Sequence, residues 1–127
     1  MTIVEPNRVY LIPPNTQMRI FKGVFELSPR EKVFGTYMPG DVFLISLAAD
    51  RGNRAIAVVL SGSNKDGTLG LTAIKAVGGV TFAQDKDTAT FDRMPLSAIA
   101  TGYVDFVLPP EQIAIELVAI GRKLKNK

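Results

Sequence analysis

The alternation of hydrophobic and polar residues changes along the chain, from short alternating runs to longer apolar ones. The run RVYLIPP at residues 8–14 predicts a short strand, which ends at two prolines because proline cannot donate to a strand ladder. The runs MRIFKG and VFELSP alternate and meet at Lys22 and Gly23, a pattern typical of a β-hairpin. Residues 30–40 contain two glycines and a proline and predict a loop.

The rest of the chain alternates between helix-like and strand-like segments. Asp41 predicts the N-cap of a helix that runs to Asp50 and ends at Gly52, and its apolar run leaves so little polar face that we expect it to be well buried. The segments that follow are a strand at 55–60, a helix with Leu71, Ile74 and Val77 on one face and a strand at 80–85. After them come a short helix with Pro95 in its first turn and Gly102 past its end, a strand at 104–110 and a last helix at 111–125. This order predicts an α/β fold with a largely parallel sheet, flanking helices and one β-hairpin, formed by residues 1–127 as one domain.

Composition narrows the class of protein. The 127 residues are 46% hydrophobic and 21% charged, as in an ordinary globular domain, and no aromatic residues lie between the basic ones, so we expect no nucleic-acid binding. The chain has neither cysteine nor histidine and its acidic residues do not cluster, so we expect no metal and no cofactor. The start MTIVEPNR lacks the layout of a signal peptide, and no apolar run has the length of a membrane span. We therefore expect a cytoplasmic protein without membrane insertion.

One acidic residue lies in a glycine-rich loop, LSGSNKDGTLGL at residues 60–71, between a predicted strand and a predicted helix. Ligands and catalytic groups collect at such carboxyl ends of parallel strands. Asp66 could cap the following helix, or it could be the acid of a hydrolytic triad, although the chain has no histidine for it to orient. A phosphate-binding loop fits less well, because the lysine expected before Thr68 is missing. Residue types alone leave the first two interpretations open.

Three longer stretches carry a family resemblance. They are VYLIPPN, DVFLISLAADRGNRAIAVVLSGSNKDGTLGLTAIKAVGGVTFAQD and FDRMPLSAIATGYVDFVLPP. In this order they resemble the C-terminal part of the catalytic domain of CheB-type chemotaxis protein-glutamate methylesterases, and most of all the version fused to a methyltransferase. The resemblance covers residues 9–117. It implies a partial version of a doubly wound α/β serine hydrolase, which removes methyl groups from glutamyl esters on chemoreceptors and can deamidate receptor glutamines.

The resemblance also implies roles for individual residues. The triad acid of the family matches Asp66, whereas the serine and histidine of the family lie upstream, in segments that these 127 residues do not contain. Ser63, Asn64 and Met94 match positions around the family's active site and are candidates for substrate binding. Ser63 and Asn64 depart from the glycine-rich pattern usual there. Near Met94, Arg93 replaces a usual glycine and Leu96 a usual arginine.

These assignments lead to two main hypotheses. In the first, the chain is part of a methylesterase, is inactive alone, and acts on the cytoplasmic region of methylated chemoreceptors when a separate chain supplies the missing serine and histidine. In the second, it is a non-catalytic module that binds receptors or assembles with itself. A third reading, an independent hydrolase that uses Ser61 or Ser63 with Lys65, is the weakest, because an exposed lysine stays protonated.

Two structural expectations follow from the missing segments. Asp66 should lie at the carboxyl-end rim of the sheet, near Ser63 and Met94, with its carboxylate facing an open crevice. The strand at residues 55–60, AIAVVL, has no charge or proline to protect its edge, so we expect a homo-oligomer, most simply a two-fold dimer. The alternative is a monomer in which residues 1–8 or the C-terminal helix cover the gap.

Overall fold

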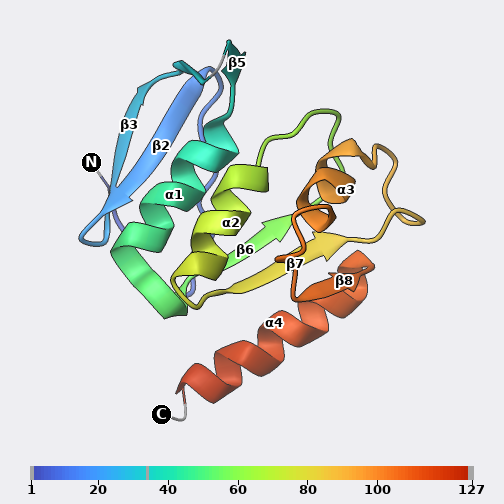
Figure 1. Ribbon diagram of the computed structural model, residues 1–127. Coiled ribbons are helices and arrows are strands. Elements are labelled where there is room, and N and C mark those ends of the chain that lie inside the picture. Colours follow the sequence, from blue (N-terminus) through green and yellow to red (C-terminus); the bar gives the residue numbers. More distant parts are fainter. Residues whose placement is uncertain (1, 34, 126–127) are drawn as a thin grey trace.

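The computed structural model describes residues 2–33 and 35–125 of the chain, and its ribbon is shown in Figure 1. The strands are β1 (Thr2–Ile3), β2 (Thr16–Phe21), β3 (Val24–Pro29), β4 (Lys32–Val33), β5 (Thr36–Tyr37), β6 (Ile56–Val59), β7 (Val80–Gln84) and β8 (Phe106–Leu108). The helices are α1 (Pro39–Arg51), the short 3-10 helix η1 (Gly52–Arg54), α2 (Thr68–Ala76), α3 (Arg93–Ile99) and α4 (Pro110–Lys125).

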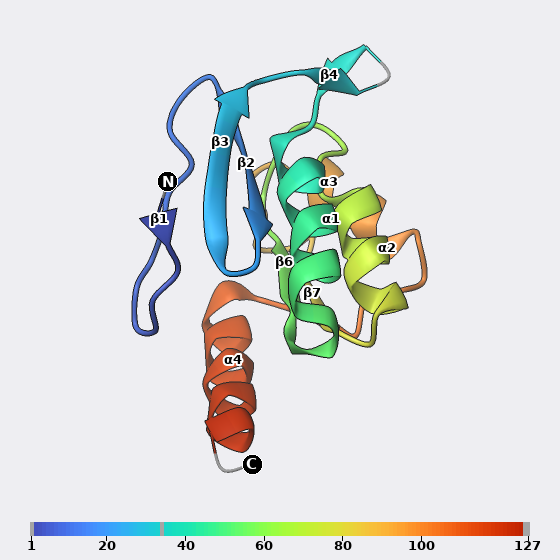
Figure 2. The ribbon, with the colours of Figure 1, turned by 90° about the vertical axis from the view of Figure 1, so that its left-hand side faces the viewer.

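A parallel sheet of three strands lies at the centre, in the order β6-β7-β8. Figure 2 shows α4 on one side of this sheet and α1, α2 and α3 on the other. The central strand β7 is therefore covered on both faces, and its residues from Thr81 to Gln84 are all buried. This arrangement confirms the predicted α/β fold with a parallel sheet and flanking helices.

The hairpin formed by β2 and β3 is confirmed as well. The turn residues Lys22 and Gly23 both have positive φ angles, 49° and 73°, as the tight turns of hairpins require. Their backbone N–H groups donate to the carboxylate of Asp50 near the end of α1, which fixes the hairpin to that helix. Met18, Ile20 and Phe25 form a buried cluster of the hairpin, against which Phe43 and Leu47 of α1 pack.

The strand predicted at residues 8–14 does not form. This segment keeps the alternation of a strand, because Tyr10 and Ile12 pack against the hairpin cluster, whereas Val9 and Leu11 are 92% and 87% exposed. Within the described residues it has no neighbouring strand to pair with, and a ladder needs one. The prediction was wrong because an alternating sequence determines which side chains point toward the core, whereas a strand also needs a second strand beside it.

Smaller differences concern loops and helix faces. The loop predicted at residues 30–40 contains the short pair β4 and β5, and Phe34 in it lies outside the described residues. α2 ends at Ala76, so Val77 is outside the helix and 39% exposed. α1 is less buried than expected: Ile45 is 48% exposed, although the helix packs mainly against β2 and α2.

α1 and α2 run side by side in the same direction, as Figures 1 and 2 both show, and they approach closely at Gly70. A Cβ atom at Gly70 would lie 2.5 Å from Cβ of Leu44 on α1. Helix propensity alone favours alanine over glycine in a helix by about 1 kcal/mol. At this position the steric contact outweighs that preference.

We expect Gly70→Ala to lower the free energy of unfolding by about 1–3 kcal/mol, the usual cost of overpacking, measured by urea denaturation. The matched control is Gly121→Ala, at a helical glycine of α4 whose Cβ would meet nothing within 4 Å. There alanine should stabilise the protein slightly. Equal effects of the two substitutions would contradict the tight helix contact.

Candidate active site

The loop after β6 is held at the carboxyl end of the parallel sheet by a network of hydrogen bonds. The N–H of Ser61 donates to Oε1 of Gln84 at the end of β7, at 2.8 Å. The N–H of Gly62 donates to the carbonyl of Phe91 at 2.8 Å, and the N–H of Met94 donates back to the carbonyl of Gly62 at 3.0 Å. A Cβ atom at position 62 would lie 2.0 Å from the sulfur of Met94, so any larger residue there would force the Met94 side chain to move. Residues 61–62 and 91–94 thus form one rim.

Asp66 follows this rim, just before α2, as its place after β6 predicts. Its side chain does not face an open crevice, which corrects the expected orientation: the residue is only 9% exposed. Oδ2 accepts the N–H of Gly40 and Oδ1 accepts the N–H of Asp41, both at 2.8 Å. These donors belong to the first turn of α1 and have no acceptor within their own helix. Asp66 therefore caps α1.

Asp41 does the reverse. It was expected as the N-cap of its own helix, but α1 begins at Pro39, with Met38 as N-cap. Asp41 is 3% exposed, and its Oδ1 accepts the N–H of Gly67 at 3.0 Å and the N–H of Gly70 at 2.7 Å. Asp66, just before α2, thus caps the start of α1, and Asp41, in the first turn of α1, caps the start of α2; we call this arrangement the crossed caps. The signal that sequence analysis missed is Pro39, since proline favours the first position of a helix.

The electrostatics of the crossed caps follow from their position. The positive ends of two parallel helix dipoles lie next to each other, and two carboxylates compensate them. Burial raises the pKa of Asp41 above its ordinary value and the charge of Asp66 raises it further, although hydrogen bonds from the N–H groups of Gly70 and Gly67 oppose this shift. Because the pKa of Asp41 is higher in the folded state than in the unfolded state, its ionisation disfavours folding. The contribution of Asp41 to stability therefore declines as the pH rises from the ordinary pKa of an aspartate to the raised pKa in the folded protein.

The other candidate residues lie close to Asp66 in the sequence or along the rim. Oδ1 of Asn64 accepts the N–H of Asp66 at 2.8 Å, so this oxygen stabilises the loop itself. Ser63 is exposed, and Met94 is half-buried against the cluster of Val59, Leu71 and Ala98. The structure therefore brings Met94 to the loop through Gly62, while Ser63 is left facing solvent.

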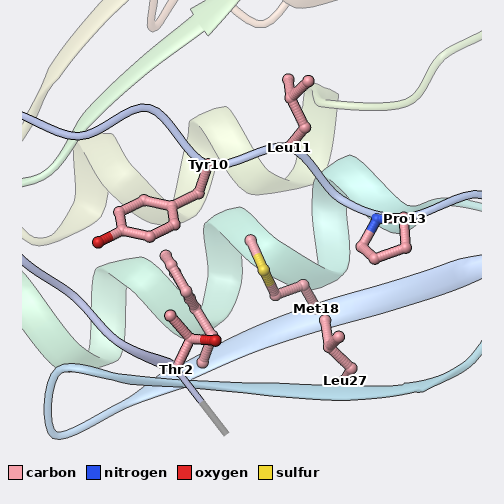
Figure 3. A pocket seen from close by; sticks show the side chains of 7 residues that line it. Thr2, Tyr10, Leu11, Pro13, Met18 and Leu27 are labelled. Atoms are coloured by element: carbon pink, nitrogen blue, oxygen red, sulfur yellow. The ribbon is translucent and has the colours of Figure 1, made fainter.

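Elsewhere, a cavity of about 350 Å³ lies between the N-terminal segment and the hairpin. Figure 3 shows the side chains that line it, which are Thr2, Tyr10, Leu11, Pro13, Met18, Phe25 and Leu27. It shares no residue with the rim around Asp66. Within residues 2–33 and 35–125, no group of histidine, cysteine or acidic residues could hold a metal ion. The helices of that same part include none that is long and apolar enough to cross a membrane.

Comparisons with known proteins show the family to which the chain belongs. The family model for CheB methylesterase matches residues 1–117. The protein-glutamate methylesterase/protein-glutamine glutaminase of Pyrococcus horikoshii is 35% identical over 132 residues, covering 96% of this chain and 36% of that protein. An enzyme of the same name from the group 3 operon of Rhizobium meliloti is 38% identical over 121 residues, covering 94% of this chain and 34% of that protein.

A solved structure agrees. The crystal structure of the Thermotoga maritima CheB methylesterase catalytic domain superimposes with a TM-score of 0.76 at 34% identity, covering 85% of this chain and 59% of that one. This chain thus spans about a third of the length of the two curated relatives above and part of the solved catalytic domain. The family model, the identities to these relatives and the shared fold show that the chain belongs to the CheB methylesterase family.

Proposed function

We propose that this chain supplies the acid, Asp66, of a Ser-His-Asp esterase site. The observation that carries the proposal is the fixed position of the Asp66 carboxylate at the carboxyl end of β6, held by two N–H groups at 2.8 Å. Each carboxylate oxygen can accept a second hydrogen bond, so a histidine Nδ1–H can still bind there. In a triad the acid orients that histidine and stabilises its imidazolium form.

The proposed reaction is the hydrolysis of glutamyl methyl esters on the cytoplasmic region of chemoreceptors, as part of chemotaxis. The names of the relatives support this, since they are protein-glutamate methylesterases. The 127 residues include no histidine, so the histidine, and with it the nucleophilic serine, would come from polypeptide outside them. Ser63, Asn64 and Met94 would line the substrate side of the rim. The reaction needs neither a metal nor a cofactor and would take place in the cytoplasm.

The sheet offers a surface for the missing polypeptide. Among the described strands, β6 pairs only with β7, so its other edge is free. β1 pairs with β3, and α4 packs against β7 and β8, so neither terminus supplies β6 with a second neighbour. Val9 and Leu11 add exposed apolar side chains. An unpaired apolar edge favours association with another strand.

The test compares residues 1–127 alone with a hybrid chain. In the hybrid, the part of the Thermotoga maritima catalytic domain that this chain does not cover precedes residue 1. We expect no methanol release from a methylated chemoreceptor fragment by the chain alone, because the nucleophile and the base are absent. The hybrid should hydrolyse the ester. A folded, inactive hybrid would contradict the proposal, as would activity of the chain alone.

The free edge of β6 also supports a second candidate function, a non-catalytic module that binds receptors or pairs with itself. Light scattering of the chain alone at micromolar concentration separates the cases. The 13.8 kDa chain would appear as a dimer if β6 or the exposed residues around Val9 pair with a second copy. A dimer that persists while the hybrid stays inactive would favour the module over the esterase.

A further inference from the structure

We propose that Asp41 is a positioning residue for Asp66, so that the crossed caps, and not the loop sequence alone, hold the acid in place. The functional half of this inference rests on the esterase function proposed above. Its structural half concerns only the two helices and can be tested on the chain alone.

The hydrogen bonds between the two residues form a closed ring. The backbone N–H of Asp41 donates to Oδ1 of Asp66 at 2.8 Å. The N–H of Gly67, the residue directly after Asp66, donates to Oδ1 of Asp41 at 3.0 Å. Each aspartate is thus held through both its backbone region and its side chain, as in a capping box spread over two helices. A displacement of the Asp66 carboxylate must therefore move the start of α1, and a displacement of the Asp41 carboxylate must move the loop that carries Asp66.

Burial leaves the ring no easy substitute for Asp41. The N–H groups of Gly67 and Gly70 are buried with their residues and have Asp41 as their acceptor. If the carboxylate were removed, these donors would be left unsatisfied, and the loop would have to open to let water reach them. Asp66 stands one residue before Gly67, so this opening would carry it away from α1.

The space around Asp66 is as restricted as its hydrogen bonds. A Cβ atom at Gly40 would lie 2.9 Å from Oδ2 of Asp66 and 3.1 Å from its Cγ. Gly40 is in the first turn of α1 and has no positive φ, so alanine there suits the backbone. Gly40→Ala therefore displaces the Asp66 carboxylate directly and serves as the reference for a misplaced acid.

The first experiment measures amide hydrogen exchange at Gly40, whose N–H has Asp66 as its acceptor and makes no bond to the Asp41 side chain. We expect Asp41→Ala to speed this exchange by about tenfold or more, because a hydrogen bond to a charged group is lost when Asp66 moves. Asp41→Asn should give an exchange rate between those of Asp41→Ala and the unsubstituted chain, since the side-chain oxygen of asparagine still accepts hydrogen bonds. Gly40→Ala should remove the protection of this amide as well.

The matched control is Asp50→Ala. Asp50 lies in the same helix, its side chain is 8% exposed, and it too accepts two backbone N–H groups, those of Lys22 and Gly23. The Asp50→Ala substitution should leave the exchange rate of the Gly40 amide unchanged relative to that of the core amide of Ile74. If Asp41→Ala accelerates amide exchange at Gly40 no more than at Ile74, Asp41 acts only on global stability and the proposal is wrong.

The second experiment uses the hybrid esterase. Asp41→Ala should lower kcat by about a hundredfold with KM little changed, since a displacement of about 1 Å at a catalytic group has that cost, whereas Asp50→Ala should leave both unchanged. An active hybrid whose kcat resists Asp41→Ala would overturn the positioning role. An inactive unsubstituted hybrid would count only against the proposed esterase function. The exchange experiment on the chain alone tests separately whether Asp41 holds Asp66 in place.

Discussion

Asp66→Asn is expected to lower kcat of the hybrid esterase by about three to four orders of magnitude, as loss of a triad acid does elsewhere. The asparagine amide can no longer stabilise an imidazolium, and it can hold the histidine in the wrong tautomer. It would also turn an N–H group toward a donor of α1, where Asp66 now accepts from both Gly40 and Asp41. The measurement is steady-state methanol release from the methylated receptor fragment.

The control for this loss is Asp105→Asn. Asp105 also accepts a backbone N–H, that of Thr81, but it lies at the amino end of β8, at the opposite edge of the sheet from Asp66. It should change kcat by no more than a few-fold. Urea denaturation of both variants at the assay temperature shows whether the protein is still folded. A folded Asp66→Asn hybrid that keeps a tenth or more of the activity would exclude Asp66 as the acid.

Phe82→Ala is expected to lower the free energy of unfolding by about 3–5 kcal/mol, the usual cost of removing a fully buried aromatic side chain. Phe82 is 0% exposed in the central strand β7, and its ring stacks on Phe106 of β8 with centroids 4.9 Å apart. The substitution leaves a cavity on one face of the sheet, beside the ring of Phe106. Urea or thermal denaturation followed by circular dichroism measures the loss.

The same substitution at an exposed site provides the comparison. Phe21 ends β2 and is 59% exposed, so Phe21→Ala should cost well under 1 kcal/mol. Equal losses at the two positions would mean that the parallel sheet is not the centre of the core. A loss at Phe82 below about 1 kcal/mol would mean that the site collapses around the missing ring.

The features that were predictable from the sequence depend on neighbouring residues. The hairpin follows from alternation around Lys22 and Gly23, and the strands β6 and β7 follow from two short apolar runs, the second of which begins directly after Gly79. The segment around Val9 has an equally regular pattern and yet forms no strand. Its pattern fixes which side chains face the hairpin, but pairing requires a second strand, and the described residues offer none.

The candidate site shows the same limit. The place of Asp66 after β6 was predictable, because the order of strand and helix determines which end of the sheet a loop occupies. The direction of its carboxylate was not. Capping rules connect a side chain to the helix that it begins. Asp66 instead caps α1 and Asp41 caps α2, through hydrogen bonds between residues 25 to 29 positions apart in the sequence. Only the packing of α1 on α2 brings these groups together.

The crossed caps also bear on the order of folding. Every donor and acceptor in them lies between Gly40 and Gly70, so closing them requires only loops of moderate length, whose entropic cost rises slowly with length. These separations, 25 to 29 positions, are close to the 24 positions between paired residues of β6 and β7, so the crossed caps can close together with the sheet and without polypeptide outside this chain. We therefore expect Asp66 to be held in place by the α1–α2 pair before any further strand joins the free edge of β6. In the proposed function, the α1–α2 pair would then be a preformed template on which the remaining groups of the esterase site assemble.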